Sequence, residues 1–278
     1  MKKLLKLILV ATLTLATAFS VIGCGGGKDE KVIKVGASPT PHAEILRQCV
    51  EPLKAKGYTL EIVEFDDYVL PNTSVEDGET DANYFQHLPY LNDFNKNNGT
   101  NIVSVCAIHY EPFAIYGKNV SKDDFTTTKT GRTILIPDDG SNGTRALFLL
   151  QEQGYITLKE GVSASDTLTV LDIADAKGNT VTAVTASEIP AQLNVANDGT
   201  LGVINGNYAL SAGLNVANAL ALESATGEAA SLYANILAVK KGNENSDKIK
   251  ALKEVLLSET IKNYINNTYN GAVLSVVE

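Results

Sequence analysis

The fold class is decided by the segment Val32-Ile33-Lys34-Val35-Gly36-Ala37-Ser38-Pro39-Thr40-Pro41-His42-Ala43-Glu44-Ile45-Leu46. Its first six residues form a short β-branched run, and prolines then precede the start of a helix. Residues 59–65 form a second strand-like run, with Leu60 and Ile62 facing inward. A strand, a helix and a strand in this order predict a βαβ unit, and therefore an α/β fold with a parallel sheet and a right-handed crossover.

The segment Gly78-Glu79-Thr80-Asp81-Ala82-Asn83-Tyr84-Phe85-Gln86-His87-Leu88-Pro89-Tyr90 mixes carboxylates, amides, a histidine and aromatic rings. We interpret it as an irregular wall of a small-molecule pocket, because aromatic residues give large contact area and a polar tip. The alternative is a loop that its apolar residues anchor to the core. Ligands of open parallel sheets bind beyond the carboxyl ends of the strands, where Ser38, Tyr68 and residues 85–90 would meet, which favours the pocket.

A second strand, turn and helix pattern follows in Thr133-Ile134-Leu135-Ile136-Pro137-Asp138-Asp139-Gly140-Ser141-Asn142-Gly143-Thr144-Arg145 and the helical residues 146–151. Backbone N–H groups of such a turn and the helix dipole bind anions. Arg145 makes a carboxylate the expected anion, since the guanidinium fork matches it. A nucleotide site is excluded because no Gly-Lys-Ser/Thr follows. Pairing of Arg145 with a neighbouring acid is the alternative.

The chain is expected to cross between two lobes twice. Residues 102–116 are too long for one strand and contain Pro112, so two strands should meet at 110–112. Further strands are expected at 168–173, 201–204 and 231–239, helices at 187–193 and from Ser246, and a tight turn at 205–209 whose amides could contact a ligand. We place lobe 1 at 32–115 plus 235–278 and lobe 2 at 116–234, with a cleft and hinges between them.

The first residues indicate export and lipidation. A basic start, an apolar stretch and Val21-Ile22-Gly23-Cys24 predict a lipoprotein signal peptide at 1–23, an acylated Cys24 and a flexible tether at 24–31. Removing three lysines with the signal takes the formal charge from −9 to −12, so nucleic acid is not expected as a partner. Cys49 and Cys106 are either paired or simply buried.

Five segments together resemble the methionine-binding lipoproteins, the substrate-binding subunits of bacterial methionine ABC importers. They are residues 35–46, 81–91, His109-Tyr110-Glu111-Pro112, Ser141-Asn142-Gly143-Thr144-Arg145-Ala146-Leu147 and Val203-Ile204-Asn205-Gly206-Asn207-Tyr208-Ala209. The resemblance implies a type II periplasmic-binding-protein fold that closes on a free amino acid. It also implies an extracytoplasmic, membrane-anchored monomer that needs no cofactor, catalyses no reaction and delivers L-methionine to a permease.

The resemblance assigns two ends to the ligand site. It implies that Arg145 holds the ligand carboxylate, helped by Asn142, Asn205 and Asn235. It also implies that the thioether lies among Tyr68, Phe85, His87, Tyr90 and His109. The chain departs from the family pattern at Gly140-Ser141, Thr144 and residues 189–193, so its preference could shift to another amino acid or a methionine derivative.

Two other classes of function were weighed. A zinc-binding lipoprotein could use His42, His87, His109 and Glu111 as ligands, but these histidines are scattered singly and Arg145 would have no role. A surface hydrolase needs a nucleophile beside a base, and no Gly-x-Ser-x-Gly or metalloprotease motif is present. The acidic pairs at 66–67 and 138–139 are interpreted as solvated turns, so we expect no enzyme activity.

Overall fold

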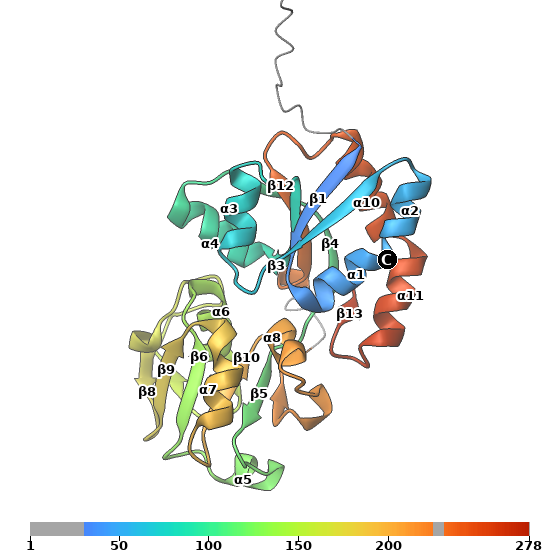
Figure 1. Ribbon diagram of the computed structural model, residues 1–278. Helices are drawn as coiled ribbons and strands as arrows, with labels where there is room; N and C mark the ends of the chain where they lie inside the picture. The colour runs from blue at the N-terminus through green and yellow to red at the C-terminus, as the bar shows by residue number, and fades with distance from the viewer. Residues whose placement is uncertain (1–30, 225–230, 278) are drawn as a thin grey trace, which may run out of the picture.

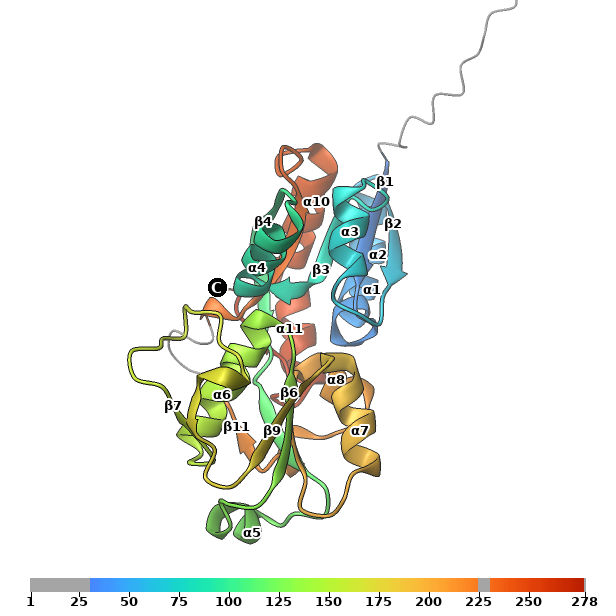
Figure 2. The ribbon, with the colours of Figure 1, turned by 90° about the vertical axis from the view of Figure 1, so that its left-hand side faces the viewer.

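The computed structural model describes residues 31–224 and 231–277, which form two α/β lobes (Figure 1). The predicted signal peptide, Cys24 and the tether up to residue 30 lie outside this range, as do residues 225–230. None of the helices in the described part has the length and apolar character needed to cross a bilayer. The lobes lie end to end in two perpendicular views (Figure 2).

Lobe 1 is built on a six-stranded mixed sheet. Its strands, in spatial order, are β13 (Leu274–Ser275), β4 (Ile102–Tyr110), β12 (Asn235–Lys240), β3 (Ala82–His87), β1 (Val32–Ala37) and β2 (Thr59–Glu64). The predicted βαβ unit is confirmed, since β1 pairs in parallel with β2 from Val32 opposite Thr59 to Ala37 opposite Glu64. β12 returns from the second lobe and inserts antiparallel between β3 and β4.

Helices cover both faces of this sheet (Figure 1). They are the π-helical turn η1 (Pro39–Ala43), α1 (Glu44–Gln48), α2 (Val50–Ala55), α10 (Asp247–Leu256) and α11 (Glu259–Thr268) on one face, and α3 (Leu70–Glu76) and α4 (Leu88–Asn98) on the other. Successive β12 side chains point to opposite faces, as strand geometry requires. Leu237 and Val239 accordingly enter one apolar core, and Ile236 and Ala238 enter the other.

Lobe 2 has a five-stranded sheet and a small ribbon. The sheet strands are β11 (Ala221–Leu222), β5 (Ala114–Gly117), β10 (Leu201–Ile204), β6 (Thr133–Pro137) and β9 (Thr180–Val184), and the ribbon pairs β7 (Thr157–Leu158) with β8 (Ile173–Asp175). Its helices are α5 (Lys122–Thr127), α6 (Gly140–Glu152), α7 (Ile189–Val195), α8 (Gly206–Ser211) and the short turns η2 (Val170–Asp172), η3 (Ala186–Glu188) and η4 (Val216–Asn218).

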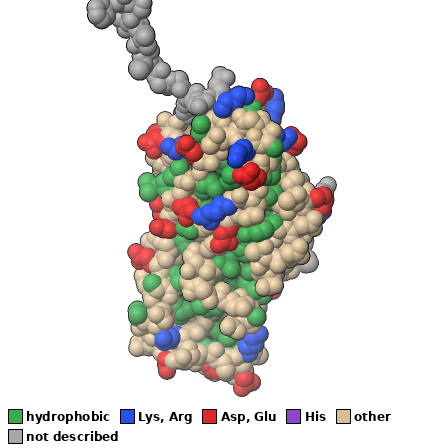
Figure 3. Space-filling model, turned by 45° about the vertical axis from the view of Figure 1, so that its right-hand side comes forward, with side chains coloured by type: hydrophobic (Ala, Val, Ile, Leu, Met, Phe, Trp, Pro, Cys, Tyr) green, Lys and Arg blue, Asp and Glu red, His purple; other side chains and the backbone are tan. Residues whose placement is uncertain are grey.

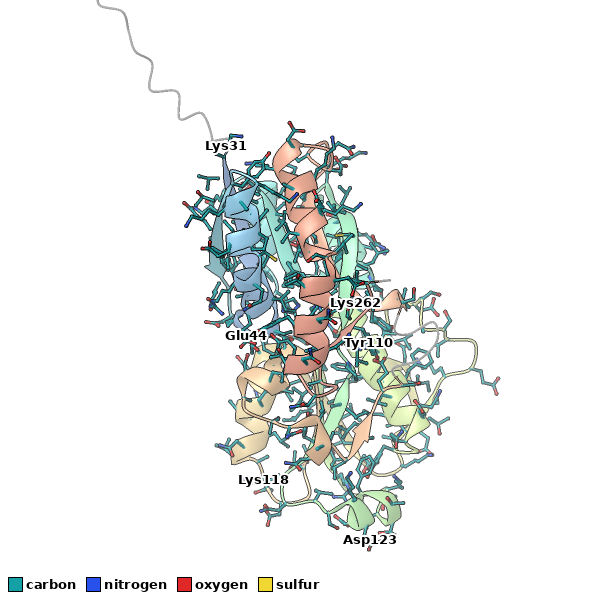
Figure 4. The ribbon with its side chains drawn as sticks, turned by 90° about the vertical axis from the view of Figure 1, so that its right-hand side faces the viewer. Lys31, Glu44, Tyr110, Lys118, Asp123 and Lys262 are labelled. Atoms are coloured by element: carbon teal, nitrogen blue, oxygen red, sulfur yellow. The ribbon has the colours of Figure 1, made fainter. Side chains whose placement is uncertain are left out.

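The chain leaves the first sheet where the proline-containing break was predicted. β4 ends at Tyr110 and β5, which belongs to the second sheet, begins at Ala114. The predicted boundary after residue 115 therefore falls inside β5, and the crossing lies at 111–113. Figure 4 shows Tyr110 at the level where the lobes meet, with Lys31 and Lys118 far from it at opposite ends of the molecule. The return crossing lies between β11 and β12.

Several predicted elements differ from the structure. The backbone of segment 78–90 is regular rather than irregular: it contains the buried central strand β3 and the start of α4, because β1 and β12 pair with β3 on both sides. The tight turn expected at 205–209 is helix α8, and the strand expected at 168–173 is mostly the turn η2. The strand expected from residue 231 begins only at Asn235. Helix α11, which follows α10, was not predicted.

The two cysteines of the described chain are free thiols rather than a disulfide. Cys49 is buried at the end of α1, and Cys106 is partly buried in β4. Burial raises the pKa of the Cys49 thiol to about 12 and that of Cys106 to about 11, so both are protonated near neutral pH.

Replacing a core side chain of strand β12 tests this architecture. We expect Leu237→Ala to lower the free energy of unfolding by about 2 to 5 kcal/mol, because Leu237 is wholly buried in the main lobe 1 core. Leu171→Ala is the matched control, since Leu171 is 78% exposed and should change stability by less than about 0.5 kcal/mol. Urea denaturation measures both, and equal effects would contradict the predicted core.

Candidate functional site

A narrow polar pocket lies between the lobes. Its lining comes from lobe 1, from the first crossing and from lobe 2, and consists of Tyr68, Phe85, Gln86, His87, Tyr90, Glu111, Asn142, Arg145, Asn205, Gly206, Asn207 and Asn235. The cavity volume is about 20 Å³, which suffices for one water molecule. A larger ligand can therefore enter only if side chains or lobes move apart.

One end of the pocket is aromatic. The rings of Tyr68, Phe85 and Tyr90 contact one another: the centroid of Tyr68 lies 5.7 Å from that of Phe85 and 5.6 Å from that of Tyr90, and the last two are 6.0 Å apart. β3 supplies Phe85 and α4 supplies Tyr90, whose hydroxyl donates to the backbone oxygen of Tyr68 at 3.0 Å. Tyr208 of lobe 2 packs on the Tyr68 ring at 4.8 Å, so this wall spans both lobes. Such edge-to-face and tilted contacts fix the rings in place.

The other end contains Arg145, which is buried on α6. Its Nε donates to both carboxylate oxygens of Glu223 at 2.9 Å, and its Nη2 donates to the backbone oxygen of Glu111 at 2.9 Å. The guanidinium also lies 4.4 Å from the ring centroid of Tyr233 and 4.7 Å from that of Phe113. Arg145 thus pairs with an acid, as the alternative from sequence proposed, but the pair is buried rather than exposed.

Amide side chains connect the two lobes across the pocket. The Tyr68 hydroxyl donates to Oδ1 of Asn207 at 2.6 Å, and Nε2 of His87 lies 3.2 Å from Oδ1 of Asn142. Nδ2 of Asn205 donates to the same Asn142 oxygen at 2.9 Å. The Asn205 oxygen is buried and has no hydrogen-bond partner among the described residues, so it is available to a donor in the pocket.

In the turn before α6, a side chain of the protein occupies the place that was predicted for a ligand anion. Asp139 is the N-cap of α6, and its carboxylate accepts from the backbone nitrogen of Asn142 at 2.8 Å and from Nδ2 of Asn142 at 3.0 Å. The first-turn N–H groups were expected to bind a ligand anion, but Asp139 itself already occupies this position. Asp139 also fixes the amide of Asn142, whose oxygen faces His87 and Asn205.

Behind the pocket, two histidines surround Glu111. Nε2 of His109 lies 2.7 Å from Oε1 of Glu111, and Nε2 of His42 lies 3.4 Å from the same oxygen. Nδ1 of His109 is hydrogen-bonded to the Tyr84 hydroxyl, and Nε2 of His42 lies 3.0 Å from Oδ1 of Asn235. These atoms are near enough to each other for a metal centre. Nε2 of His109 and Oε1 of Glu111 are hydrogen-bonded to each other, so a metal ion held by both would have to replace this bond.

All three histidines are buried, and none is visible on the face in Figure 3, where acidic and basic side chains alternate. Burial lowers the pKa of His42 to about 4 and the pKa values of His87 and His109 to about 3. Arg145 contributes further to the shift of His87. Each imidazole is therefore neutral near pH 7 and can both donate and accept a hydrogen bond.

The structure brings eight of the nine ligand residues expected from the sequence into the pocket lining. His109 is the exception, because it lies behind Glu111. The sequence interpretation did not assign Gln86, Glu111 or Gly206 to the ligand, and it offered Asn207 only as an alternative to a simple turn. Glu111 and Asn207 carry local signals, in the His-Tyr-Glu-Pro break and the Asn-Gly-Asn motif. Glu223 carries none, since it lies 78 residues from Arg145 in a segment without a motif.

The buried histidines predict an acid-sensitive fold. Their pKa values are lower in the folded chain than the usual 6.5, so the unfolded chain binds more protons below that pH. The free energy of unfolding should therefore fall as the pH drops from about 6.5 toward 4, by at most about 1.4 kcal/mol per pH unit for each histidine. The raised pKa of Glu111 acts in the opposite direction.

Urea titrations from pH 4 to pH 8 measure this slope. His87→Gln should reduce it by up to one histidine's share, because an amide does not titrate. A slope that His87→Gln leaves unchanged would contradict a neutral, buried His87.

The chain is similar in sequence to known proteins along most of its length. The profile of the NlpA lipoprotein family matches residues 33–277. The methionine-binding lipoprotein MetQ of Bacillus subtilis is 40% identical over the full length of both chains. The D-methionine-binding lipoprotein MetQ of Escherichia coli K12 is 32% identical and aligns with 92% of this chain and 93% of its own.

A solved structure shares the fold. The nutrient binding protein of Burkholderia cenocepacia bound to methionine is 34% identical, with a TM-score of 0.79 over 88% of this chain and 99% of its own. The predicted fold class, two α/β lobes of the type II periplasmic-binding-protein kind, is confirmed. By sequence along nearly its whole length and by fold, the chain belongs to the NlpA lipoprotein family.

Proposed function

We propose that this protein captures free L-methionine between its lobes and delivers it to an ABC importer, without catalysing a reaction. The observation that carries this proposal is the pocket itself, which joins a buried arginine and amides at one end to three aromatic rings at the other. An amino acid with an apolar side chain has the same two ends. A solved relative with this fold is described as bound to methionine.

Arg145 is the proposed partner of the ligand carboxylate. A guanidinium donates through a planar fork and stays charged when buried, which suits bidentate carboxylate recognition. Glu223 now accepts from Nε and Nη2 of this arginine. The ligand carboxylate must therefore share the guanidinium with Glu223 or displace it.

The ammonium group of the ligand has two proposed acceptors. Oδ1 of Asn205 is buried without a partner in the described chain, and the carboxyl group of Glu111 lines the same pocket. A wrong ligand that lacks the ammonium would leave these acceptors unpaired, which costs affinity. This requirement favours free amino acids over their N-acylated or deaminated relatives.

The thioether is proposed to contact Tyr68, Phe85 and Tyr90. A sulfur atom near the edge of an aromatic ring gains about 0.3 to 1.5 kcal/mol, and the flexible methionine chain fits irregular gaps. Relatives are named for methionine and for D-methionine, so both enantiomers belong in the test, together with leucine and glutamine. Tighter binding of another apolar amino acid would keep the site and change the ligand.

Conservative replacement of the arginine tests the carboxylate contact. We expect L-methionine to bind the wild-type protein and Arg145→Lys to weaken binding by about 30-fold, because lysine keeps the charge but loses the planar fork of donors, and a lost hydrogen bond to a carboxylate costs about 2 kcal/mol. Arg132→Lys is the matched control: Arg132 is also buried, pairs with Asp124 at 2.8 Å and does not line the pocket.

Isothermal titration calorimetry of refolded, ligand-stripped protein gives both affinities, and thermal unfolding checks that each variant is folded. Equal affinities for Arg145→Lys and Arg132→Lys would rule out Arg145 as the carboxylate partner. Absence of methionine binding to the wild-type protein, with saturable binding of zinc, would overturn the proposed function in favour of the metal-binding alternative.

We further propose that Cys24 is acylated and holds a monomeric binding protein on the outer side of the cell membrane. The lipobox-like Val21-Ile22-Gly23-Cys24 supports this, and relatives are named as lipoproteins. Several acyl chains make such an anchor stable, at about 0.8 kcal/mol for each buried methylene. The described chain begins at Lys31, at the end of lobe 1 far from lobe 2 (Figure 4), so a tether there would leave the pocket free.

Cys24→Ser should move the protein from the membrane fraction to the soluble extracytoplasmic fraction, since no acyl chain can attach to it. Cys106→Ser is the control, because Cys106 lies inside the folded domain. Fractionation followed by immunoblotting, with intact-mass measurement of the membrane-bound form, reports the result. A Cys24→Ser protein that stays in the membrane fraction would contradict the lipid anchor.

A further inference from the structure

The side chain of Glu111 is buried among neutral and polar groups at the edge of the pocket. It lies between His109 of β4 and His42 of η1, both of which are at most 1% exposed. Gly206 of α8 closes the lobe 2 side, where a Cβ atom would come within 2.6 Å of Oε2 of Glu111. Glycine at this position therefore allows the α8 backbone to approach the carboxyl group, and Glu111 lines the pocket.

The titratable and charged groups facing Glu111 come from every element around it. They are His109 and Tyr84 from the sheet of lobe 1, His42 from η1, Tyr68 from the loop before α3, and Arg145 from α6. The histidines are neutral near pH 7, and the tyrosines are protonated because burial raises their pKa values. Arg145 supplies the positive charge, and it is already paired with Glu223.

Arg145 pairs with the carboxylate of Glu223 and bonds only the backbone oxygen of Glu111, so the Glu111 carboxyl group has no ion pair with a guanidinium. Burial without a cation of its own disfavours the ionised carboxylate, and desolvation raises the pKa of Glu111 despite the nearby His42, Arg145 and the N–H of Asn207. Glu223 has the closer ion pair, and its pKa is lowered by Arg145 against the effect of burial. The two acids therefore differ in protonation: Glu223 stays ionised, and Glu111 binds a proton more readily than Glu223 does.

The hydrogen bonds also fix the role of His109. The Tyr84 hydroxyl is protonated and buried, and Nδ1 of His109 is its one hydrogen-bond partner among the described residues. We therefore assign the hydroxyl as donor to Nδ1, which places the imidazole hydrogen on Nε2. Nε2 therefore donates to Oε1 of Glu111 at 2.7 Å. A donor to a carboxylate stabilises the ionised form, so His109 lowers the pH at which Glu111 ionises.

We propose that Glu111 holds a proton in the free protein, that the ammonium group of the bound amino acid displaces it, and that His109 is the positioning residue that sets the pH of this exchange. The proposal rests on the proposed amino-acid function. In the exchange the O–H bond of the Glu111 carboxyl group breaks, the proton passes to the solvent, and the ligand N–H group donates to the carboxylate that remains.

The sign of the pH dependence follows from this exchange. One proton leaves for each ligand bound, so affinity should rise up to tenfold per pH unit while free Glu111 is protonated. Above the pH at which free Glu111 ionises, no proton is released and affinity should reach a plateau. A ligand without an ammonium group should release no proton at any pH.

Calorimetric titration of the mature protein with L-methionine between pH 5 and pH 8 tests the proposal. It is repeated at each pH in buffers with different heats of ionisation, so that the number of released protons is measured directly. We expect release approaching one proton below the plateau and none above it. Glu111→Gln should bind more weakly and show neither buffer dependence nor a slope.

Variants of His109 separate positioning from a purely structural role. His109→Phe removes the donor and should move the plateau to higher pH, and His109→Gln, which restores an amide donor, should move it back. A structural defect would weaken binding equally at all pH values. His87→Gln is the control: this buried pocket histidine bonds Asn142 and not Glu111, so it should change affinity but leave the plateau in place.

Two results would overturn the proposal. One is methionine binding whose heat is independent of the buffer throughout this pH range. The other is a Glu111 carboxyl group that titrates at or below the usual 4.5 in the free protein. Carbon NMR of labelled glutamate, assigned with Glu111→Gln, measures the latter without any ligand. If methionine does not bind at all, the proposed function fails and this NMR titration still decides the state of Glu111.

Discussion

The burial of Arg145 is the constraint on which the arrangement of the two lobes depends. A guanidinium cannot lose its proton inside a protein, so its charge must be neutralised where it lies. Glu111 and Phe113, at the first crossing, supply a backbone oxygen and a ring face. Glu223 and Tyr233, which flank the second crossing, supply a carboxylate and another ring face. Arg145 on α6 therefore contacts residues of both segments that connect the lobes.

This arrangement couples the pocket to the hinges. A ligand carboxylate that takes hydrogen bonds from Arg145 competes with Glu223, and Glu223 also accepts from the Tyr110 hydroxyl at 2.5 Å, at the last residue of β4. Loss of the bond from Arg145 to Glu223, or of the bond from Tyr110 to Glu223, would change the contacts at a crossing as well as those at the ligand. In the proposed function, ligand recognition by Arg145 would therefore involve the contacts that join the two crossings, as hinge closure around a ligand requires.

Local patterns in the sequence predicted the parts of the fold that neighbouring residues determine. The βαβ unit, the break around Pro112 and the strand, turn and helix that place Arg145 all follow from β-branched runs, prolines and glycines a few residues apart. Pairing between distant segments decided the rest. Residues 82–87 form a central strand because β12, some 150 residues later, pairs with it. Polar Asn83 and Gln86 are tolerated there because they bond each other and Asn72.

The same limit applies to the site. Residue types and a family resemblance placed Arg145, the amides and the rings in one pocket, since each carries a chemical signature. No signature marks Glu223 as the partner of Arg145, or His109 as the support of Glu111 rather than a ligand contact, because these roles arise only when separate segments meet. Their physical importance comes from burial: an unpaired charge costs several kcal/mol there, so the partners are as constrained as the residues that they hold.

The size of the cavity then determines the order of events in binding. With about 20 Å³ between the lobes, the bonds from Tyr68 to Asn207 and from His87 to Asn142 close the pocket over its polar groups. In the proposed function, an amino acid separates these bonds before it reaches Arg145 and Glu111, and it recovers the cost only if both of its charged ends find partners. A ligand with one charged end would open the cleft and leave the other buried group unpaired. If the proposed function holds, the closed pocket discriminates by the requirement that both charged ends of the ligand be paired at once.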